Sequence, residues 1–187
     1  MNARRAEHAG IKVNRPSALT KHCLYLIDGS GYIFRAFYGL PPLTRKSDGM
    51  PVGAVAGFCS MLAGLRERAE SDGVVSHMAV VFDAGRITFR NEIYPEYKAN
   101  RDETPPELVP QFAPIKEAVP AFGLPALEMP GFEADDLIAT LAKQAEAAGM
   151  QVVVVTSDKD MMQLIRDGVS LLDPIKNTPV GPDEVKA

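Results

Sequence analysis

The chain has 187 residues, of which 46% are hydrophobic and 24% charged, the proportions of a one-domain globular protein rather than of a disordered chain. Its formal net charge of −4 argues against a surface coated in positive charge for nucleic-acid binding, although it allows a local basic strip. Since no stretch approaches the roughly 18 apolar residues of a membrane span, we expect no membrane partner.

The N-terminal residues 1–22 contain five basic residues but no apolar segment of the signal-peptide type, so we expect a disordered leader. The two cysteines, Cys23 and Cys59, stand far apart in apolar surroundings. This placement indicates buried thiols in a reducing compartment and not a disulfide framework. The expected location is therefore the cytoplasm.

After this leader, short β-rich apolar runs alternate with segments of helical period. The runs predict strands at 23–27, 78–82, 126–129, 152–155 and 169–172, and the periodic segments predict helices at roughly 52–70, 105–121, 133–148 and 159–166. This alternation indicates an α/β fold with a mainly parallel central sheet of about five strands and helices on both faces. Residues 86–110 have little helical period, so we expect a long excursion over the surface, of the kind that often carries function.

Seven acidic residues stand where this fold would gather them, either after an expected strand or at the start of the helix that follows one. They are Asp28, Asp83, Glu133, Asp135, Asp136, Asp158 and Asp160. Because ligands bind outside the carboxyl ends of parallel strands, we expect these carboxylates at one rim of the sheet. On a helix, Glu133 and Asp136 would project within roughly 60° of each other, with Asp135 about 100° further round.

Carboxylates gathered in this way need a counter-charge, because two like charges about 4 Å apart repel by roughly 4 kcal/mol at an effective dielectric near 20. Lys159 is the only basic residue within these motifs. We therefore expect a hard divalent cation, Mg²⁺ or Mn²⁺, in a two-metal site of the kind that hydrolyses phosphodiesters. For any single acid, a plain alternative is a helix cap or a favourable contact with a helix dipole.

A basic strip lies directly after Asp83. Four cations in residues 86–101 alternate with Phe89, Tyr94 and Tyr97; these cations are Arg86, Arg90, Lys98 and Arg101. Cations and aromatic faces together suit a single-stranded nucleic acid, although a solvated loop pinned to the core by its aromatics would have the same composition. Near the first strand, Phe34 and Arg35 are further candidates for contact with DNA.

Taken in order, these motifs resemble the 5′-nuclease domain at the N-terminus of bacterial DNA polymerase I, a relative of the flap endonucleases in the PIN-like superfamily. The matching pieces are LIDGSGYIFRAF, PPLT, AVVFDAGRITFRNEIYPEYKANR, GFEADDLIATLA and TSDKDMMQLI. The resemblance implies a PIN-like three-layer domain in which all seven acids bind metal. It also implies that Lys98 and Arg101 engage the scissile phosphate and that the strip contributes to a helical arch over the substrate strand. From the composition of the strip, we expect Arg90 to contact DNA as well.

The family hydrolyses DNA at 5′ flaps and nicks and removes RNA primers, and its longer members carry polymerase domains. Its pattern continues with a GDxSDN-type segment, which holds two further aspartates, and a helix-hairpin-helix. This sequence ends at GPDEVKA, so we expect residues 23–187 to be the N-terminal lobe of such a nuclease, with an incomplete metal site. Two alternatives stay open: a catalytically impaired DNA-binding fragment, and a phospho-acceptor receiver domain.

Overall fold

The computed structural model describes residues 22–71, 75–174 and 176–182. Within these residues the strands form one six-stranded sheet with the order β3-β2-β1-β4-β5-β6. The strands are β1 (Cys23–Asp28), β2 (His77–Val81), β3 (Ala126–Leu127), β4 (Gln151–Val155), β5 (Val169–Asp173) and β6 (Thr178–Val180). All neighbouring strands are parallel except β5 and β6, which pair antiparallel.

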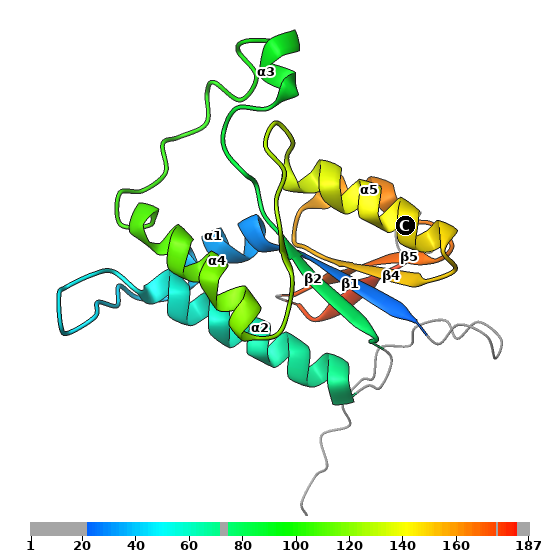
Figure 1. The fold of residues 1–187 in the computed structure, drawn as a ribbon, viewed down its shortest axis with the longest axis horizontal. Coiled ribbons are helices and arrows are strands. Elements are labelled where there is room, and N and C mark those ends of the chain that lie inside the picture. Colours follow the sequence, from blue (N-terminus) through cyan, green and yellow to red (C-terminus); the bar gives the residue numbers. More distant parts are fainter. Residues whose placement is uncertain (1–21, 72–74, 175, 183–187) are drawn as a thin grey trace, which may run out of the picture.

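The central strands are apolar without alternation because both faces of the sheet are covered. On one face, Tyr25 and Ile27 pack with helices α1 (Gly29–Gly39), α2 (Gly53–Ser71) and α4 (Phe112–Ala121). On the other face, Leu26 packs with α5 (Ala134–Ala147) and the 3₁₀ helix η2 (Lys159–Leu164). Figure 1 shows α1, α2 and α4 on one side of the strands and α5 on the other. The three-layer α/β prediction is confirmed.

The five predicted strands are all present, but the helix predictions need four corrections, the fourth being the short helix α3 (Phe89–Ile93) described in the next paragraph. Helix α1 was not predicted as an element, because its glycines and aromatics lack a clear helical stripe. The helix expected at 105–121 begins later, with the 3₁₀ helix η1 (Val109–Gln111) and then α4. Pro105, Pro106 and Pro110 stand in its expected first two turns, and proline cannot donate a backbone hydrogen bond. The segment expected at 159–166 forms η2 and ends at Leu164.

The excursion at residues 86–110 contains one short helix, α3 (Phe89–Ile93), which stands apart at one end of the molecule (Figure 1). Its chain returns to the body at Gln111, whose side chain is 1% exposed. The amide oxygen of Gln111 accepts hydrogen bonds from Ala54 N at 2.8 Å and Val55 N at 3.2 Å, while its nitrogen donates to the Glu107 carbonyl. Gln111 therefore ties the end of the excursion to the first turn of α2.

The remaining expectations concern the leader, the cysteines and the membrane. Apart from His22, the leader predicted at residues 1–22 lies outside the described residues. Cys23 is buried and Cys59 half-buried, and both carry free thiols. Among the helices described, none combines the length and the apolar character needed to cross a membrane.

Candidate metal centre and nucleic-acid interface

The candidate site lies at the carboxyl ends of β1, β2 and β4. Here the chain stops adding strands on one side of β1 and begins to add them on the other side. From β1 the chain first adds β2 and β3 on one side and later β4 and β5 on the other, so the gap between β1 and β4 is the switch point at which such sheets bind ligands. Asp28 ends β1 on one side of this gap, and Thr156 follows β4 on the other.

Asp28 is 7% exposed and is held by two donors. Its Oδ1 accepts a hydrogen bond from Gly31 N at 2.8 Å, which caps α1, and its Oδ2 accepts one from the Thr156 hydroxyl at 2.9 Å. Burial raises the pKa of Asp28, with a further upward contribution from Asp83 and Asp158, and these two hydrogen bonds oppose it. A Cβ on Gly31 would lie 2.5 Å from Asp28 Oδ2, so glycine is required at this approach.

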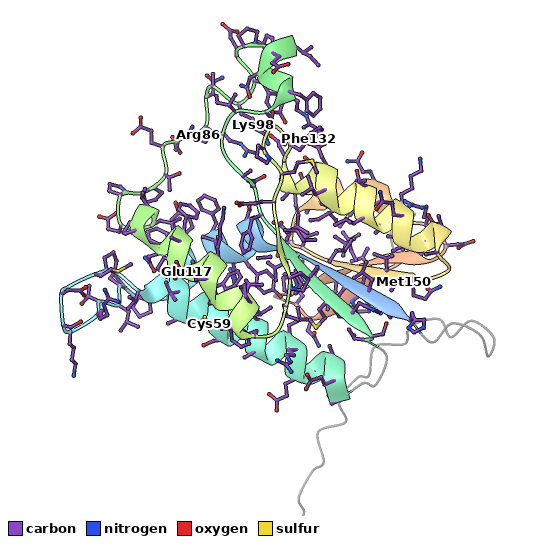
Figure 2. All side chains as sticks on the ribbon, viewed as in Figure 1. Cys59, Arg86, Lys98, Glu117, Phe132 and Met150 are labelled. Carbon is purple, nitrogen blue, oxygen red and sulfur yellow. The ribbon has the colours of Figure 1, made fainter. Side chains whose placement is uncertain are left out.

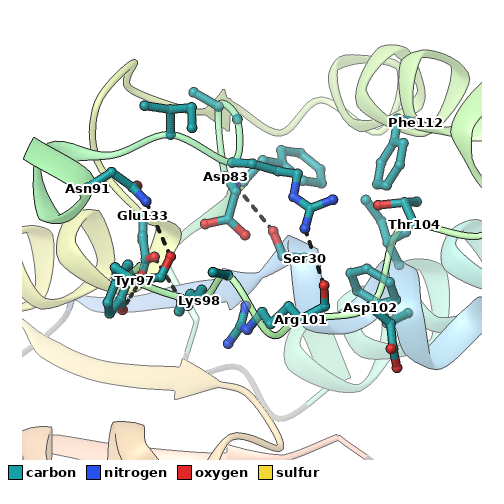
Figure 3. A pocket seen from close by; sticks show the side chains of 18 of the residues that line it. Ser30, Asp83, Asn91, Tyr97, Lys98, Arg101, Asp102, Thr104, Phe112 and Glu133 are labelled. Carbon is teal, nitrogen blue, oxygen red and sulfur yellow. Dashed lines mark hydrogen bonds and ion pairs between the residues drawn. The ribbon is translucent and has the colours of Figure 1, made fainter. Parts of the chain in front are cut away.

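Asp83 connects β2 to the start of α5. Its Oδ1 accepts a hydrogen bond from Ala134 N at 2.8 Å, and its own backbone N donates to the Ser30 hydroxyl at 3.2 Å. These contacts place the carboxylate between α1 and α5, although the residue is exposed. Figure 3 shows Asp83 and Ser30 side by side, joined by this hydrogen bond.

Asp135 is the residue on which the other acids converge. Burial, together with the charges of four neighbouring acids, raises its pKa to about 6; these acids are Asp28, Asp158, Asp83 and Glu133. The five acids come from four separate segments of the chain. Hydrogen bonds join these segments at one rim, because Ala134 N donates to Asp83 and the Thr156 hydroxyl contacts both Asp28 and Asp158 N. A carboxylate held in such surroundings favours either a proton or a cation.

Glu133 and Asp136 already have cationic partners, which come from the basic strip and not from the motifs that hold the acids. This corrects the expectation that a divalent cation must neutralise all seven acids. Arg90 donates from both Nη atoms to Asp136, at 2.6 and 2.7 Å, and Lys98 Nζ lies 2.8 Å from Glu133 Oε1. Tyr97 also donates to Glu133, at 3.4 Å. The hydrogen bonds from Arg90 lower the pKa of Asp136. The basic segment (residues 86–101) therefore contacts the acidic rim directly.

Helix geometry accounts for this division of the three acids at the start of α5. Glu133 is the N-cap residue, and Asp136 Oδ2 accepts a hydrogen bond from its backbone N at 3.1 Å in a capping box. Because the capping box joins Glu133, whose backbone is extended, to Asp136, both side chains reach the basic segment, whereas Asp135 lies near the acids at the strand ends. The start of α5 thus supplies Glu133 and Asp136 to the basic segment and Asp135 to the acidic rim.

The acids of the rim have the oxygen chemistry that a hard divalent cation prefers. As they stand, no three His, Cys, Asp or Glu side chains in the described part of the chain are close enough together to hold a metal ion. Asp158 lies near Asp28 and Asp135, but its Oδ1 accepts a hydrogen bond from Asp160 N at 2.8 Å. Asp160 is exposed, at the start of η2. The acids of the rim fit a metal ion by their charge and their oxygen atoms, and their side chains would have to rotate to bring three of them around one ion.

A pocket of about 550 Å³ separates the basic segment from the body of the protein. Figure 3 shows Lys98, Arg101 and Asp83 around it, with Phe112 on its far side. Phe34 and Arg86 also line the pocket, whereas Arg35 is exposed and does not. Figure 2 places Arg86, Lys98 and Phe132 together toward the end of the molecule at which α3 stands. The pocket is therefore walled by both aromatic and cationic side chains.

Lys98 reaches Glu133 from an unusual backbone position, with φ of 57°. A non-glycine residue in this left-handed region carries a strain of roughly 1–2 kcal/mol, which the surrounding turn must offset. The Lys98 ammonium also lies 5.2 Å from the centre of the Tyr97 ring, and the Arg90 guanidinium lies 4.6 Å from that of Phe89. Ion pairs and aromatic contacts together hold Lys98 and Arg90 in place.

Sequence reasoning missed Thr156 and Ser30 as parts of this site. Thr156 is 3% exposed, and its hydroxyl donates to Asp28 and accepts from Asp158 N at 3.0 Å. Its signal in the sequence was a hydroxyl residue between an apolar strand and an aspartate. That signal is weak, because only the parallel pairing of β1 with β4 brings Thr156 to Asp28.

Comparison with known proteins places this geometry in a family. The family model of the 5′-3′ exonuclease N-terminal resolvase-like domain matches residues 23–187. DNA polymerase I of Rhizobium leguminosarum is 54% identical over 167 residues, which are 87% of this chain and 16% of that protein. The 5′-3′ exonuclease of Aquifex aeolicus is 40% identical over 154 residues, 82% of this chain and 52% of that protein.

Solved structures agree on the fold. The T5 5′-exonuclease with bound zinc ions superposes with a TM-score of 0.65 at 24% identity, over 88% of this chain and 60% of that one. A bacteriophage T5 flap endonuclease in a complex with DNA and metal ions gives a TM-score of 0.63 at 24% identity, over 86% and 58%. The chain spans about one sixth of its polymerase relative and about half of its exonuclease relative. It belongs to the family of the 5′-3′ exonuclease N-terminal, resolvase-like domain.

Proposed function

We propose that the chain carries the metal-binding half of a 5′-nuclease active site, which hydrolyses DNA phosphodiesters with a divalent cation, Mg²⁺ or Mn²⁺. The observation that carries this proposal is the convergence of Asp28, Asp83 and Asp158 on Asp135 at the switch point of the sheet. Related proteins support it, because one is a 5′-3′ exonuclease and T5 relatives were crystallised with metal ions and DNA.

In this proposal Asp28, Asp83, Asp135 and Asp158 hold the cation, which, when bound, supplies an activated water and charge stabilisation for the leaving oxygen. Glu133 joins them when it separates from Lys98. The freed Lys98 ammonium and Arg101 then orient the scissile phosphate across the pocket, where a cationic donor stabilises negative charge that develops during the reaction. Asp136 stays with Arg90 and keeps the basic segment in place.

The proposed substrate is DNA with a 5′ flap, a nick or an RNA primer. The pocket fits a single strand in composition, since Phe34 and Phe112 offer faces for bases and Arg86 and Lys98 offer charges for phosphates. We also propose a role in DNA replication and repair, as one part of a longer polymerase. The proposed location is the cytoplasm, at the bacterial nucleoid.

The test is cleavage of a 5′-labelled flap DNA with Mn²⁺, comparing the wild type with Asp135→Asn and Asp167→Asn. Asp167 is an exposed acid just before β5, at the opposite edge of the sheet, so its variant is a matched control. We expect Asp135→Asn to cleave at least about 100-fold more slowly, because it removes a charge at the reacting centre, and Asp167→Asn to match the wild type. Equal cleavage by Asp135→Asn and the wild type would contradict the proposal.

One observation favours a second candidate, the catalytically impaired DNA-binding fragment. Glu133 and Asp136 are occupied by Lys98 and Arg90, and the described residues hold no ready three-acid group. In that case the wild type binds flap DNA with an affinity that falls as salt rises, and neither Mg²⁺ nor Mn²⁺ gives a cleaved product. The same reactions therefore separate the two candidates.

A further inference from the structure

Thr156 occupies the position that joins the two sides of the switch point. It follows Val155, the last residue of β4, and Val155 pairs in register with Ile27 of β1. The next residue of each strand is therefore Thr156 on one side and Asp28 on the other. Both are buried, at 3% and 7% exposure, so their contact is shielded from water.

The hydroxyl of Thr156 both donates and accepts a hydrogen bond. A hydroxyl carries one hydrogen, and an ionised carboxylate accepts only, so the hydrogen is directed to Asp28 Oδ2 at 2.9 Å. A lone pair of the same oxygen accepts the Asp158 N–H at 3.0 Å. Beyond it, Asp158 Oδ1 accepts from Asp160 N, and Asp28 Oδ1 accepts from Gly31 N. One continuous chain of hydrogen bonds thus runs from the start of α1 to the start of η2 through Thr156.

We propose that Thr156 is a positioning residue of the proposed metal centre, which orients the Asp28 carboxylate and the Asp158 loop as one unit so that both can bind a single cation. The inference rests on the proposed function. It follows from the partners of the hydroxyl: one is a candidate ligand, and the other is the backbone of a second candidate ligand. Partners that orient metal ligands in this way contribute about 10–100-fold to metal affinity or activity.

A purely structural role for Thr156 makes a different prediction. If the hydroxyl only satisfies buried polar groups, its loss lowers the stability of the fold and leaves the metal affinity of the folded molecules unchanged. The positioning role requires that metal affinity itself depends on the hydroxyl. Serine keeps the hydroxyl and loses the methyl group, whereas valine has nearly the shape of threonine without the hydroxyl.

The experiment measures Mn²⁺ binding to the full chain by isothermal titration for the wild type, Thr156→Val, Thr156→Ala and Thr156→Ser. Thr178→Val is the matched control, because Thr178 lies in β6, outside the site, and its hydroxyl donates to the carbonyl of Lys176 just before that strand. We expect the valine and alanine variants to bind Mn²⁺ about tenfold more weakly or worse, and the serine and Thr178 variants to stay within about twofold of the wild type. Amide exchange at Asp158 should also accelerate in the valine variant.

Thermal unfolding with EDTA identifies which variants are folded, and the alanine variant decides the question if the valine variant does not fold. Wild-type affinity in the folded valine or alanine variant would overturn the positioning role and leave the proposed function standing. If serine loses as much affinity as valine, packing of the methyl group and not the hydroxyl is responsible, and the inference is wrong. If the wild type itself binds no Mn²⁺, the proposed metal centre fails and the inference with it.

Discussion

Arg90 and Asp136 form a two-point ion pair in which the two Nη atoms of the guanidinium lie 2.6 and 2.7 Å from the two carboxylate oxygens. The pair joins α3, near the start of the excursion, to the first turn of α5. The side chains are only 30% and 22% exposed, and Asp136 also accepts the Glu133 N–H of the capping box. This contact holds the basic segment over the acidic rim, and four predictions follow from it and from its surroundings.

Replacing Arg90 with alanine should destabilise the fold by about 1–2 kcal/mol, because Asp136 is left partly buried without its partner. Arg90→Lys should recover little of this loss, since an ammonium cannot make the two parallel hydrogen bonds. Urea denaturation measures both. As a control, Arg45→Ala removes an ion pair with Asp48 whose side chains are 53% and 47% exposed, and it should leave the urea midpoint unchanged. An Arg90→Lys variant as stable as the wild type would contradict the two-point geometry.

Replacing Lys98 with methionine should raise the affinity for Mn²⁺ by about threefold, because a partly exposed ion pair that competes for Glu133 is worth under about 1 kcal/mol. The same variant should cleave flap DNA poorly, since the ammonium that faces the phosphate is lost. Titration with Mn²⁺ tests the first part, with Lys143→Met on the exposed surface of α5 as the control. Weaker Mn²⁺ binding by Lys98→Met would show that Lys98 supports the metal site and does not compete with it.

Replacing Asp135 with asparagine should stabilise the metal-free protein at neutral pH. Burial, together with Asp28 and the other acids, raises the pKa of Asp135 from its ordinary value of 3.8 to about 6. The folded state therefore binds more protons than the unfolded state between these values, and its stability falls as the pH rises from 3.8 to about 6. Above this range the asparagine variant should be more stable by about 1 kcal/mol, a figure reduced for partial exposure.

Thermal unfolding in EDTA at pH 7 and at a pH well below 3.8, the ordinary pKa of Asp135, checks this prediction. The two proteins should differ at pH 7 and converge at the lower pH, where Asp135 is protonated in both the folded and the unfolded state. Asp167→Asn, at the opposite edge of the sheet, should show no such difference. Identical unfolding midpoints for Asp135→Asn and the wild type at both pH values would mean that the acids do not repel one another as the fold implies.

Replacing Gln111 with methionine should cost about 2–3 kcal/mol, because it leaves buried backbone N–H groups at the start of α2 without an acceptor. Methionine has nearly the same volume, so the cost reports the lost hydrogen bonds and not a cavity. The urea midpoint is the measurement, and Gln144→Met on the exposed surface of α5 is the control. A Gln111 variant with wild-type stability would show that the end of the excursion is not tied to α2 through this side chain.

The strands could be predicted because β1, β2 and β4 are continuous apolar runs that a doubly covered sheet requires. The rim followed from them, since an aspartate directly after a parallel strand must lie at its carboxyl edge. Helix α1 and the antiparallel strand β6 were missed, because Gly29 and Gly31 lower the apparent helical propensity and because three residues are too few to show a period. Thr178 and Val180 belong to a strand only because β5 lies beside them.

The amino-acid sequence by itself determined the α/β class, the chain positions of Asp28, Asp83 and Asp158 at strand ends, and the mixture of cations and aromatics in the basic segment, because these depend on local periodicity and residue type. Only the tertiary structure decided which charges meet. Arg90 is 46 residues from Asp136, and Thr156 is 128 residues from Asp28. Such pairings depend on strand order and on the path of the excursion, and the energy of a charge depends on the partners and burial that the folded chain provides.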